Sequence, residues 1–342
     1  MQFTGVSILS VCDIEAEEIL SSESIEKELF PYVEKFTQRS NFISLLTGIK
    51  ERRVWAKKDL KSSESGTRAA VLALEKANLD KSKIDIIINT SVTRDFIEPS
   101  VASLVHGNLG LRDDCINFDI SNACLGFVTA IDMGSTLIET GKVDYVLITN
   151  GETSSNFTNN AIDFIKKDNL TEKDFRLVFA NLTMGSGATA MILCKSELAP
   201  SNAPKIISSV ALSDTKDEHN KLCIGQVEKV MTDGNQLLTY GLQLASKTIK
   251  FGAEKYDWDK KQFDHYICHQ VGEIYSRKVM EVWETDFSKF YKTYPNFGNM
   301  GPASVVFTLS KAISDGTIKK GERILLGGIG SGINCNLMEV AF

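Results

Sequence analysis

Cys124 lies in the stretch SNACLGF, residues 121–127, between two segments of different periodicity. The five residues before this stretch, INFDI, alternate apolar and polar side chains and predict a short strand, whereas residues 126–141 carry apolar side chains at helical spacing and end on a glycine. We therefore expect Cys124 at a helix N-terminus, where free N–H groups and the helix dipole favour a thiolate and can lower a cysteine pKa to roughly 3.5–7.5. The chemistry predicted is nucleophilic attack; the alternative is a small buried apolar residue, as most free cysteines are.

Two further polar residues could assist such a thiolate. His269 follows the apolar run DHYICHQVG at the end of a predicted strand, where functional sites often form. A structural histidine that is simply hydrogen-bonded is the alternative. Asn299 lies in FGNMGPAS, just before a helix expected near Pro302, and taken alone it is more simply explained as a helix cap.

A glycine-rich segment and a loop carboxylate are weaker candidates. The segment GGIGSG, residues 327–332, resembles a phosphate-binding loop, but no long helix follows it, so we do not expect a dinucleotide site there. Backbone N–H groups at Gly330, Ser331 and Gly332 are better suited to binding substrate or an oxyanion. Glu98 lies in the loop RDFIEPS, where a solvated surface carboxylate is the usual case.

The elements that would position these residues occur twice along the chain. Residues 1–199 and 200–342 each read as strand, helix, strand, strand–turn–helix, strand and strand. Such a long period indicates a duplicated domain, and alternating strands and helices indicate mixed, largely parallel sheets covered by helices. The pattern predicts a five-layer α/β/α/β/α fold with a pseudo-twofold axis. Equivalent turns would then face a common centre, which brings Cys124 and Asn299 together with His269 nearby.

Composition excludes several classes of function. The 342 residues carry a net charge of −6 with no block of lysine and arginine, so nucleic-acid binding is not indicated. No apolar run reaches the ~18–20 residues that span a bilayer, and the N-terminus does not resemble a signal peptide. Seven scattered cysteines without a C-x-x-C motif fit reduced thiols in the cytoplasm better than disulfides or a zinc site. Neither a metal nor a redox cofactor is expected.

SNACLGF, CHQVGE and FGNMGPAS together resemble the thiolase superfamily, and within it the 3-oxoacyl-ACP (ketoacyl) synthase III branch. The resemblance extends from TGVSIL near the N-terminus to GGIGSGINCNLMEVAF at the end. It implies the duplicated five-layer thiolase fold and a homodimer. It also implies that Cys124 is the acylated nucleophile, and that His269 and Asn299 bind the oxygen of the thioester carbonyl or of an enolate.

The loop NTSVTRDFIEPSVASLVHGNLGL has Glu98–Pro99 where chain-initiating synthases usually have phenylalanine before the proline. This loop, GNMG and GIGSGINC resemble the OleA type, whose members join two fatty acyl-CoA molecules head to head in olefin biosynthesis. The resemblance implies an acyltransferase without cofactor, in which Glu98 reaches the partner subunit's site as a base and Phe96 helps to line the acyl channel.

Two alternatives remain from the sequence. A decarboxylative 3-oxoacyl-ACP synthase III would use malonyl-ACP, would not need Glu98, and would depend strictly on the malonyl thioester. A non-catalytic thiolase-fold protein would bind acyl groups, from CoA or from acyl-ACP, without acylation of Cys124. The presence of Cys124, His269 and Asn299 together argues against the second alternative.

Overall fold

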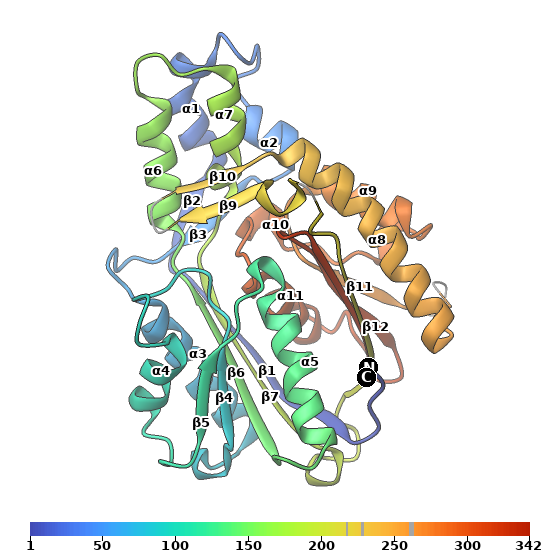
Figure 1. Cartoon of the computed structure of the whole chain (residues 1–342). Coiled ribbons are helices and arrows are strands. Elements are labelled where there is room, and N and C mark those ends of the chain that lie inside the picture. Colours follow the sequence, from blue (N-terminus) through green and yellow to red (C-terminus); the bar gives the residue numbers. More distant parts are fainter. Residues whose placement is uncertain (217, 227–228, 260–262) are drawn as a thin grey trace.

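The computed structural model describes residues 1–216, 218–226, 229–259 and 263–342. Nine strands form one mixed sheet in the order β11-β12-β13-β8-β1-β7-β6-β4-β5 (Figure 1). Their bounds are β1 Val6–Glu15, β4 Ile86–Asn89, β5 Ile116–Asp119, β6 Tyr145–Glu152, β7 Gly187–Lys195, β8 Lys205–Ser213, β11 His265–Cys268, β12 Arg323–Gly330 and β13 Asn334–Ala341. Strands of the two halves meet at the centre, where Ser7 of β1 pairs with Lys205 of β8.

The strand order repeats on the two sides of this central pair. From β1 outward, β7 and β6 are antiparallel neighbours and β4 is parallel to β6; from β8 outward, β13, β12 and β11 follow the same pattern. One predicted strand is wrong. The segment that should match β5 makes only an isolated parallel bridge, Tyr266↔Phe290, and then forms the short helix α10 (Tyr294–Phe297). Pro295 in the first turn of α10 cannot donate to a ladder, which favours the helix.

Helices cover the strands in layers. Helices α5 and α11 lie together between the two sets of strands: α5 packs on β6 and β7, and α11 packs on β1, β7 and β11. Helix α3 covers the outer face of β1, β6 and β7, and α8 covers β8 and β13 on the other side. This is the predicted five-layer α/β/α/β/α arrangement (Figure 1). The bounds of these helices and their neighbours are α3 Ser62–Ala77, α4 Val101–Leu109, α5 Gly126–Glu139, α8 Gly234–Tyr256, α9 Glu273–Val282 and α11 Ala303–Ser314.

The central helices are apolar on more than one face because both sides of the layer are covered. In α5, Phe127, Ile131 and Ile138 are buried, and in α11 nine of twelve residues are buried. A helix that is apolar nearly all round belongs in an interior. These two helices therefore pack firmly between the two sets of strands, and the residues at their N-termini are held in place by the core.

A separate group of elements lies above the end of the sheet where the active site is expected (Figure 1). Its aromatic cluster includes Phe36, Phe42, Phe175 and Phe179. For the polar stretch 155–182 the sequence predicts a loop or a short helical excursion, whereas most of this stretch is helical. The bounds are α1 Ser22–Val33, α2 Phe42–Thr47, α6 Ser155–Ile165, α7 Glu172–Val178, η3 Phe179–Thr183, and the strand pairs β2 Glu18–Ser21 with β3 Glu51–Val54 and β9 Cys223–Gln226 with β10 Lys229–Thr232.

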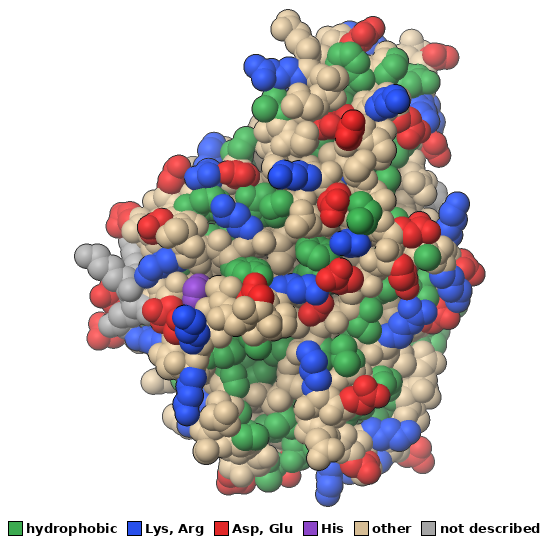
Figure 2. Space-filling view, turned by 180° about the vertical axis from the view of Figure 1, so that it is seen from behind, with side chains coloured by type: hydrophobic (Ala, Val, Ile, Leu, Met, Phe, Trp, Pro, Cys, Tyr) green, Lys and Arg blue, Asp and Glu red, His purple; other side chains and the backbone are tan. Residues whose placement is uncertain are grey.

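The surface carries charges of both signs. Seen from behind, lysine and arginine side chains alternate with aspartate and glutamate over the described face, and small apolar patches lie between them (Figure 2). Among the residues that the structure describes, no helix is long and apolar enough to cross a membrane.

Candidate active site

Cys124 lies in the short 3-10 turn η2 (Ala123–Leu125), which joins β5 to the N-terminus of α5. Ala123 has a φ of 45°, a conformation that costs an alanine free energy and that occurs preferentially at functional sites. Gly126 begins α5, and a Cβ there would lie 3.1 Å from the Thr90 carbonyl oxygen, so the turn packs closely on the loop after β4. The predicted strand–turn–helix position of Cys124 is confirmed.

The predicted effect on the pKa of Cys124 is wrong in direction. Burial raises the pKa of this thiol from 9.0 to about 12, and the nearby Cys223 and Glu152 raise it further. A backbone hydrogen bond at Cys124 itself acts in the opposite sense and is the smaller effect. Part of the residue is accessible, but the sulfur lies deep among protein atoms, where desolvation outweighs the helix end. Near neutral pH the thiol form of Cys124 is therefore favoured over the thiolate.

His269 follows β11 and is fully buried. Its backbone N–H donates to the Gly327 carbonyl, 2.9 Å away, which fixes the residue on the neighbouring strand β12. Burial lowers the pKa of the imidazole to about 4, against a hydrogen bond with the Gly301 backbone, so the ring is neutral near pH 7. No described residue provides a hydrogen-bond partner for its Nδ1. The neutral ring can therefore serve as a hydrogen-bonding group without carrying charge.

Asn299 has its backbone and its side chain held. Its N–H donates to the Thr183 carbonyl, and its own carbonyl accepts from Gly185 N–H, both at 2.9 Å. Its side-chain Oδ1 accepts from Gly301 N–H at 2.9 Å. This contact fixes the orientation of the side-chain amide and leaves Nδ2 as the group that can donate to a ligand. The N-cap of α11 is Pro302, so Asn299 is not the helix cap that the sequence allowed. Gly301 contacts both Asn299 and His269, which links the two side chains.

Strand β12 connects this pair to the cysteine turn through its glycines. A Cβ at Gly328, whose φ is 150°, would lie 2.9 Å from His269 Cβ, and a Cβ at Gly330 would lie 3.1 Å from Leu125 Cγ. Glycine is required at Gly328, where φ is positive and the approach is under 3.0 Å, while at Gly330 it allows a tight contact with the Leu125 side chain. The structure therefore gives Gly328 and Gly330 a packing role, and the oxyanion-binding role expected for Gly330, Ser331 and Gly332 stays a prediction.

A cavity of about 1020 Å³ is lined in part by Val271 and Gly272, which follow His269 closely along the chain, and by none of Cys124, His269 and Asn299. Its walls are largely aromatic and aliphatic, with contributions from Phe42 of α2, Phe175 of α7, Leu238 of α8 and Tyr275 of α9. The Tyr275 hydroxyl is buried, and no residue that the structure describes lies in hydrogen-bonding geometry with it. The pKa of this phenol is raised, mainly by burial and then by the nearby Cys335, Cys268 and Cys124. Tyr275 thus connects the cavity with the surroundings of Cys124. A large apolar cavity of this kind suits an acyl chain.

Glu98 is not part of the cluster within its own chain. It lies with Phe96 and Ile97 at the exposed tip of the loop between β4 and α4, where Phe96 is 53% and Ile97 is 88% exposed. The groups that act on the Cys124 thiol are Cys223 and Glu152 instead. Through β12 the structure links the cysteine turn to His269, and through Gly301 it links His269 to Asn299, whereas Glu98 lies on the outside.

Sequence reasoning missed two residues at this site. Glu152 ends β6 as a buried carboxyl whose pKa burial raises to about 7, against four hydrogen bonds that act to lower it. A glutamate at the end of the apolar run VDYVLITNGE was an available signal, because strand ends of this kind meet at one edge of the sheet. Tyr275, near the start of α9, carried no signal that distinguished it from an ordinary helix residue.

Comparisons with known proteins agree over the whole chain. Residues 118–215 match the model of the family "3-oxoacyl-[acyl-carrier-protein] synthase III", and residues 253–340 match the model of its C-terminal part. An acyl-CoA:acyl-CoA alkyltransferase of Xanthomonas campestris pv. campestris is 39% identical over 342 residues, covering 100% of both chains. One of Shewanella oneidensis is 31% identical over 99% of both chains.

The fold comparison gives the same result. A solved structure of a cysteine-to-serine variant of X. campestris OleA, with bound lauric acid and lauroyl-CoA, has a TM-score of 0.95 at 38% identity. It covers 99% of this chain and is itself covered completely.

Proposed function

The chain belongs to the 3-oxoacyl synthase III branch of the thiolase superfamily and to its OleA type, and we propose how its residues catalyse the head-to-head condensation of two fatty acyl-CoA molecules. The enzyme is an acyltransferase, and the reaction is a non-decarboxylative Claisen condensation. The observation that carries the assignment is the full-length similarity to acyl-CoA:acyl-CoA alkyltransferases at 39% identity. The malonyl-dependent alternative is not favoured.

In the first step, Cys124 attacks the thioester carbonyl of one acyl-CoA. The new Cys124 C–S bond replaces the C–S bond to CoA, and the thiol proton leaves with the CoA thiolate as free CoA. Because burial raises the pKa of the resting thiol to about 12, the thiol form dominates near pH 7 and its proton has to be removed in the course of acylation. Neutral His269 and the Asn299 amide are the donors proposed for the carbonyl oxygen, a kind of contact worth on the order of 10²–10³ in rate.

In the second step, a base removes a Cα proton from the second acyl-CoA. We assign this role to Glu98 of the partner subunit. The assignment is supported by the position of Glu98 at an exposed loop tip that also carries exposed apolar side chains. The same donors then hold the enolate oxygen, and the enolate carbon attacks the acyl-Cys124 carbonyl. The Cys124 thiolate leaves and is protonated, which gives a β-ketoacyl-CoA that water can hydrolyse to a β-keto acid.

A homodimer is the assembly this scheme requires. Phe96 and Ile97 directly precede Glu98 and expose large apolar side chains at the loop tip, which a second copy of the chain would cover. Neither a metal nor a redox cofactor enters any step, and the cytoplasmic location stays a prediction from the thiol pattern.

Mass spectrometry of the products tests the proposal. Purified wild-type protein given long-chain acyl-CoA alone should form a β-keto acid or its ketone, whereas Glu98→Ala should accumulate acyl-Cys124 with little product. Condensation only after malonyl-ACP is added, with Glu98→Ala as active as wild type, would identify a decarboxylative synthase. Absence of acylation by any acyl-CoA would identify a non-catalytic binder.

A further inference from the structure

The loop between β4 and α4 has a tip of four residues, and the chain is anchored by hydrogen bonds before and after this tip. The tip, residues 96–99, carries Glu98 and is exposed. After the tip, Ser100 caps α4 by accepting from Ser103 N–H at 3.1 Å. The Asp119 carboxylate accepts from the N–H groups of residues 101 and 102. The direction in which Glu98 projects therefore depends on how the residues on each side of the tip are held.

Glu152 holds the start of this loop from inside the protein. One carboxylate oxygen accepts from Val92 N–H at 2.9 Å and from Asn150 Nδ2 at 3.2 Å. The other accepts from Thr93 N–H at 3.2 Å and from the Thr93 hydroxyl at 2.8 Å. Since each oxygen already takes two hydrogen bonds, no position is left for a substrate. The contribution of Glu152 is to fix residues 92 and 93.

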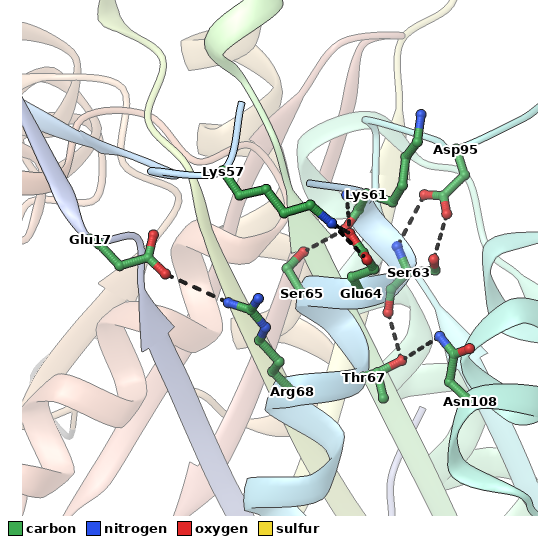
Figure 3. Close-up of polar contacts among 10 residues, drawn as sticks. All are labelled: Glu17, Lys57, Lys61, Ser63, Glu64, Ser65, Thr67, Arg68, Asp95 and Asn108. Carbon is green, nitrogen blue, oxygen red and sulfur yellow. Dashed lines mark hydrogen bonds and ion pairs between the residues drawn. The ribbon is translucent and has the colours of Figure 1, made fainter. Parts of the chain in front are cut away.

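Asp95 makes the last anchor before the tip, and it does so on another element. Its two oxygens accept from the backbone N–H of Ser63, at 3.0 Å, and from the Ser63 hydroxyl in the first turn of α3 (Figure 3). The N-cap residue of α3, Lys61, provides no side-chain hydrogen bond, so a carboxylate from a distant loop supplies one. Helix N-termini favour negative charge, which strengthens this contact.

We propose that Asp95 is a positioning residue for the condensation step. By binding the N-terminus of α3 it fixes residues 96–99, so that Glu98 enters the partner subunit's site in one orientation. The inference rests on the proposed function, in which Glu98 of the partner subunit is the base. Both Asp95 oxygens accept from Ser63, so its role is to position the loop, and the Glu152 contacts should keep the start of the loop attached in Asp95→Ala.

The first experiment compares Asp95→Ala, Asp95→Asn and Glu64→Ala. A displacement of the base by about 1 Å can cost up to 10²-fold, so Asp95→Ala should lower kcat of condensation by about tenfold or more. The burst of CoA released by acylation of Cys124 should stay within about twofold of wild type. Asp95→Asn should recover most of kcat, because its amide oxygen can still accept from Ser63 N–H.

Glu64→Ala is the matched control. Glu64 lies on the same first turn of α3, bonding Lys61 N–H at 3.0 Å and Lys57 Nζ at 3.1 Å, but it has no contact with the loop (Figure 3). It should weaken this helix end to a similar extent while kcat stays close to wild type. An equal loss of kcat in both variants would overturn the proposal in favour of helix stability.

Mixed dimers separate positioning from a structural role, because the loop acts on the other subunit. In a dimer of Asp95→Ala with Cys124→Ala, the one working cysteine is served by an intact loop, and activity per site should be normal. In a dimer of wild type with the double variant Asp95→Ala/Cys124→Ala, the working cysteine is served by the altered loop and activity should fall about tenfold.

A defect that follows the subunit bearing the working cysteine would overturn the proposal, and so would an Asp95→Ala enzyme with kcat within twofold of wild type. Full activity of Glu98→Ala would also overturn it, since there would be no base to position. If the wild-type enzyme forms no product from acyl-CoA alone, the proposed function has failed instead.

Discussion

Cys124 should react with an alkylating reagent as a buried thiol and not as a helix-activated thiolate. Burial raises the pKa of the group from 9.0 to about 12. Three units correspond to about 4 kcal/mol, and at any pH below 9 the thiolate fraction is about a thousandfold smaller than for a free thiol. A more basic thiolate is also more nucleophilic, by about 20-fold for three units at a Brønsted coefficient of 0.4–0.5. The net rate should be about fiftyfold below that of the free thiol.

The assay is the rate of iodoacetamide modification at Cys124, followed by mass spectrometry of its peptide between pH 6 and 11, with glutathione as the reference. The rate should rise about tenfold per pH unit without a plateau below pH 10. Restricted access would lower every rate equally, whereas the pKa sets the pH at which the rate stops rising, so the shape of the curve isolates the pKa.

Cys223→Ser is the control for this measurement. Cys223 is the second cause of the raised pKa of Cys124, after burial, so the variant should keep the same profile with at most a small shift. A plateau below pH 8 in wild type would refute the reasoning. It would mean that the helix end outweighs desolvation, as the sequence alone suggested.

Two further predictions concern the residues that support the site. The pKa of Glu152 is raised from 4.5 to about 7, so the folded state keeps this proton to higher pH than the unfolded state does. The free energy of unfolding of wild type should therefore fall by up to about 3 kcal/mol relative to that of Glu152→Gln as the pH rises from about 4.5 to about 7. Urea denaturation measures this difference, and a difference that stays constant with pH would contradict the prediction. Gly328→Ala should lower the melting temperature and also kcat, because its Cβ would meet His269 at 2.9 Å. Gly316→Ala, at a φ of 74° with open space around it, should lower stability alone, and equal kcat values for the two variants would contradict the role given to Gly328.

The sequence predicted the arrangement of elements well because duplication and periodicity are local patterns. The two halves could be matched strand by strand, and the turn holding Cys124 was placed correctly between β5 and α5. The missing counterpart of β5 shows the limit of this reasoning. KFYKTYPNF reads as apolar and aromatic, but whether such a segment pairs depends on its neighbour, and only Phe290 reaches a bridge.

Electrostatics at the site could not be predicted from the sequence. A helix N-terminus is visible in the pattern, but the depth of burial around it is not, and burial decides the pKa of both Cys124 and His269. Glu98 illustrates a different limit. Its chain places it at an exposed tip, and only a second subunit could give it a partner, so neither the sequence pattern nor one chain can test its role.

The duplication explains why these residues gather at one edge of the sheet. β6 and β12 are equivalent strands of eight residues each, and they end at Glu152 and Gly330. The parallel neighbour of β6 is β4 and that of β12 is β11; each of these neighbours has four residues, and its first residue pairs with the second residue of the longer strand. Thr90 and His269 therefore follow equivalent strands. In the C-terminal half this position holds the imidazole, while in the N-terminal half it leads into the loop that carries Glu98. The glycine at the end of β12 makes room for the cysteine turn, and the carboxyl at the end of β6 holds that loop. The C-terminal repeat thus supplies His269 and Asn299, while the N-terminal repeat supplies Cys124 and the loop that carries Glu98.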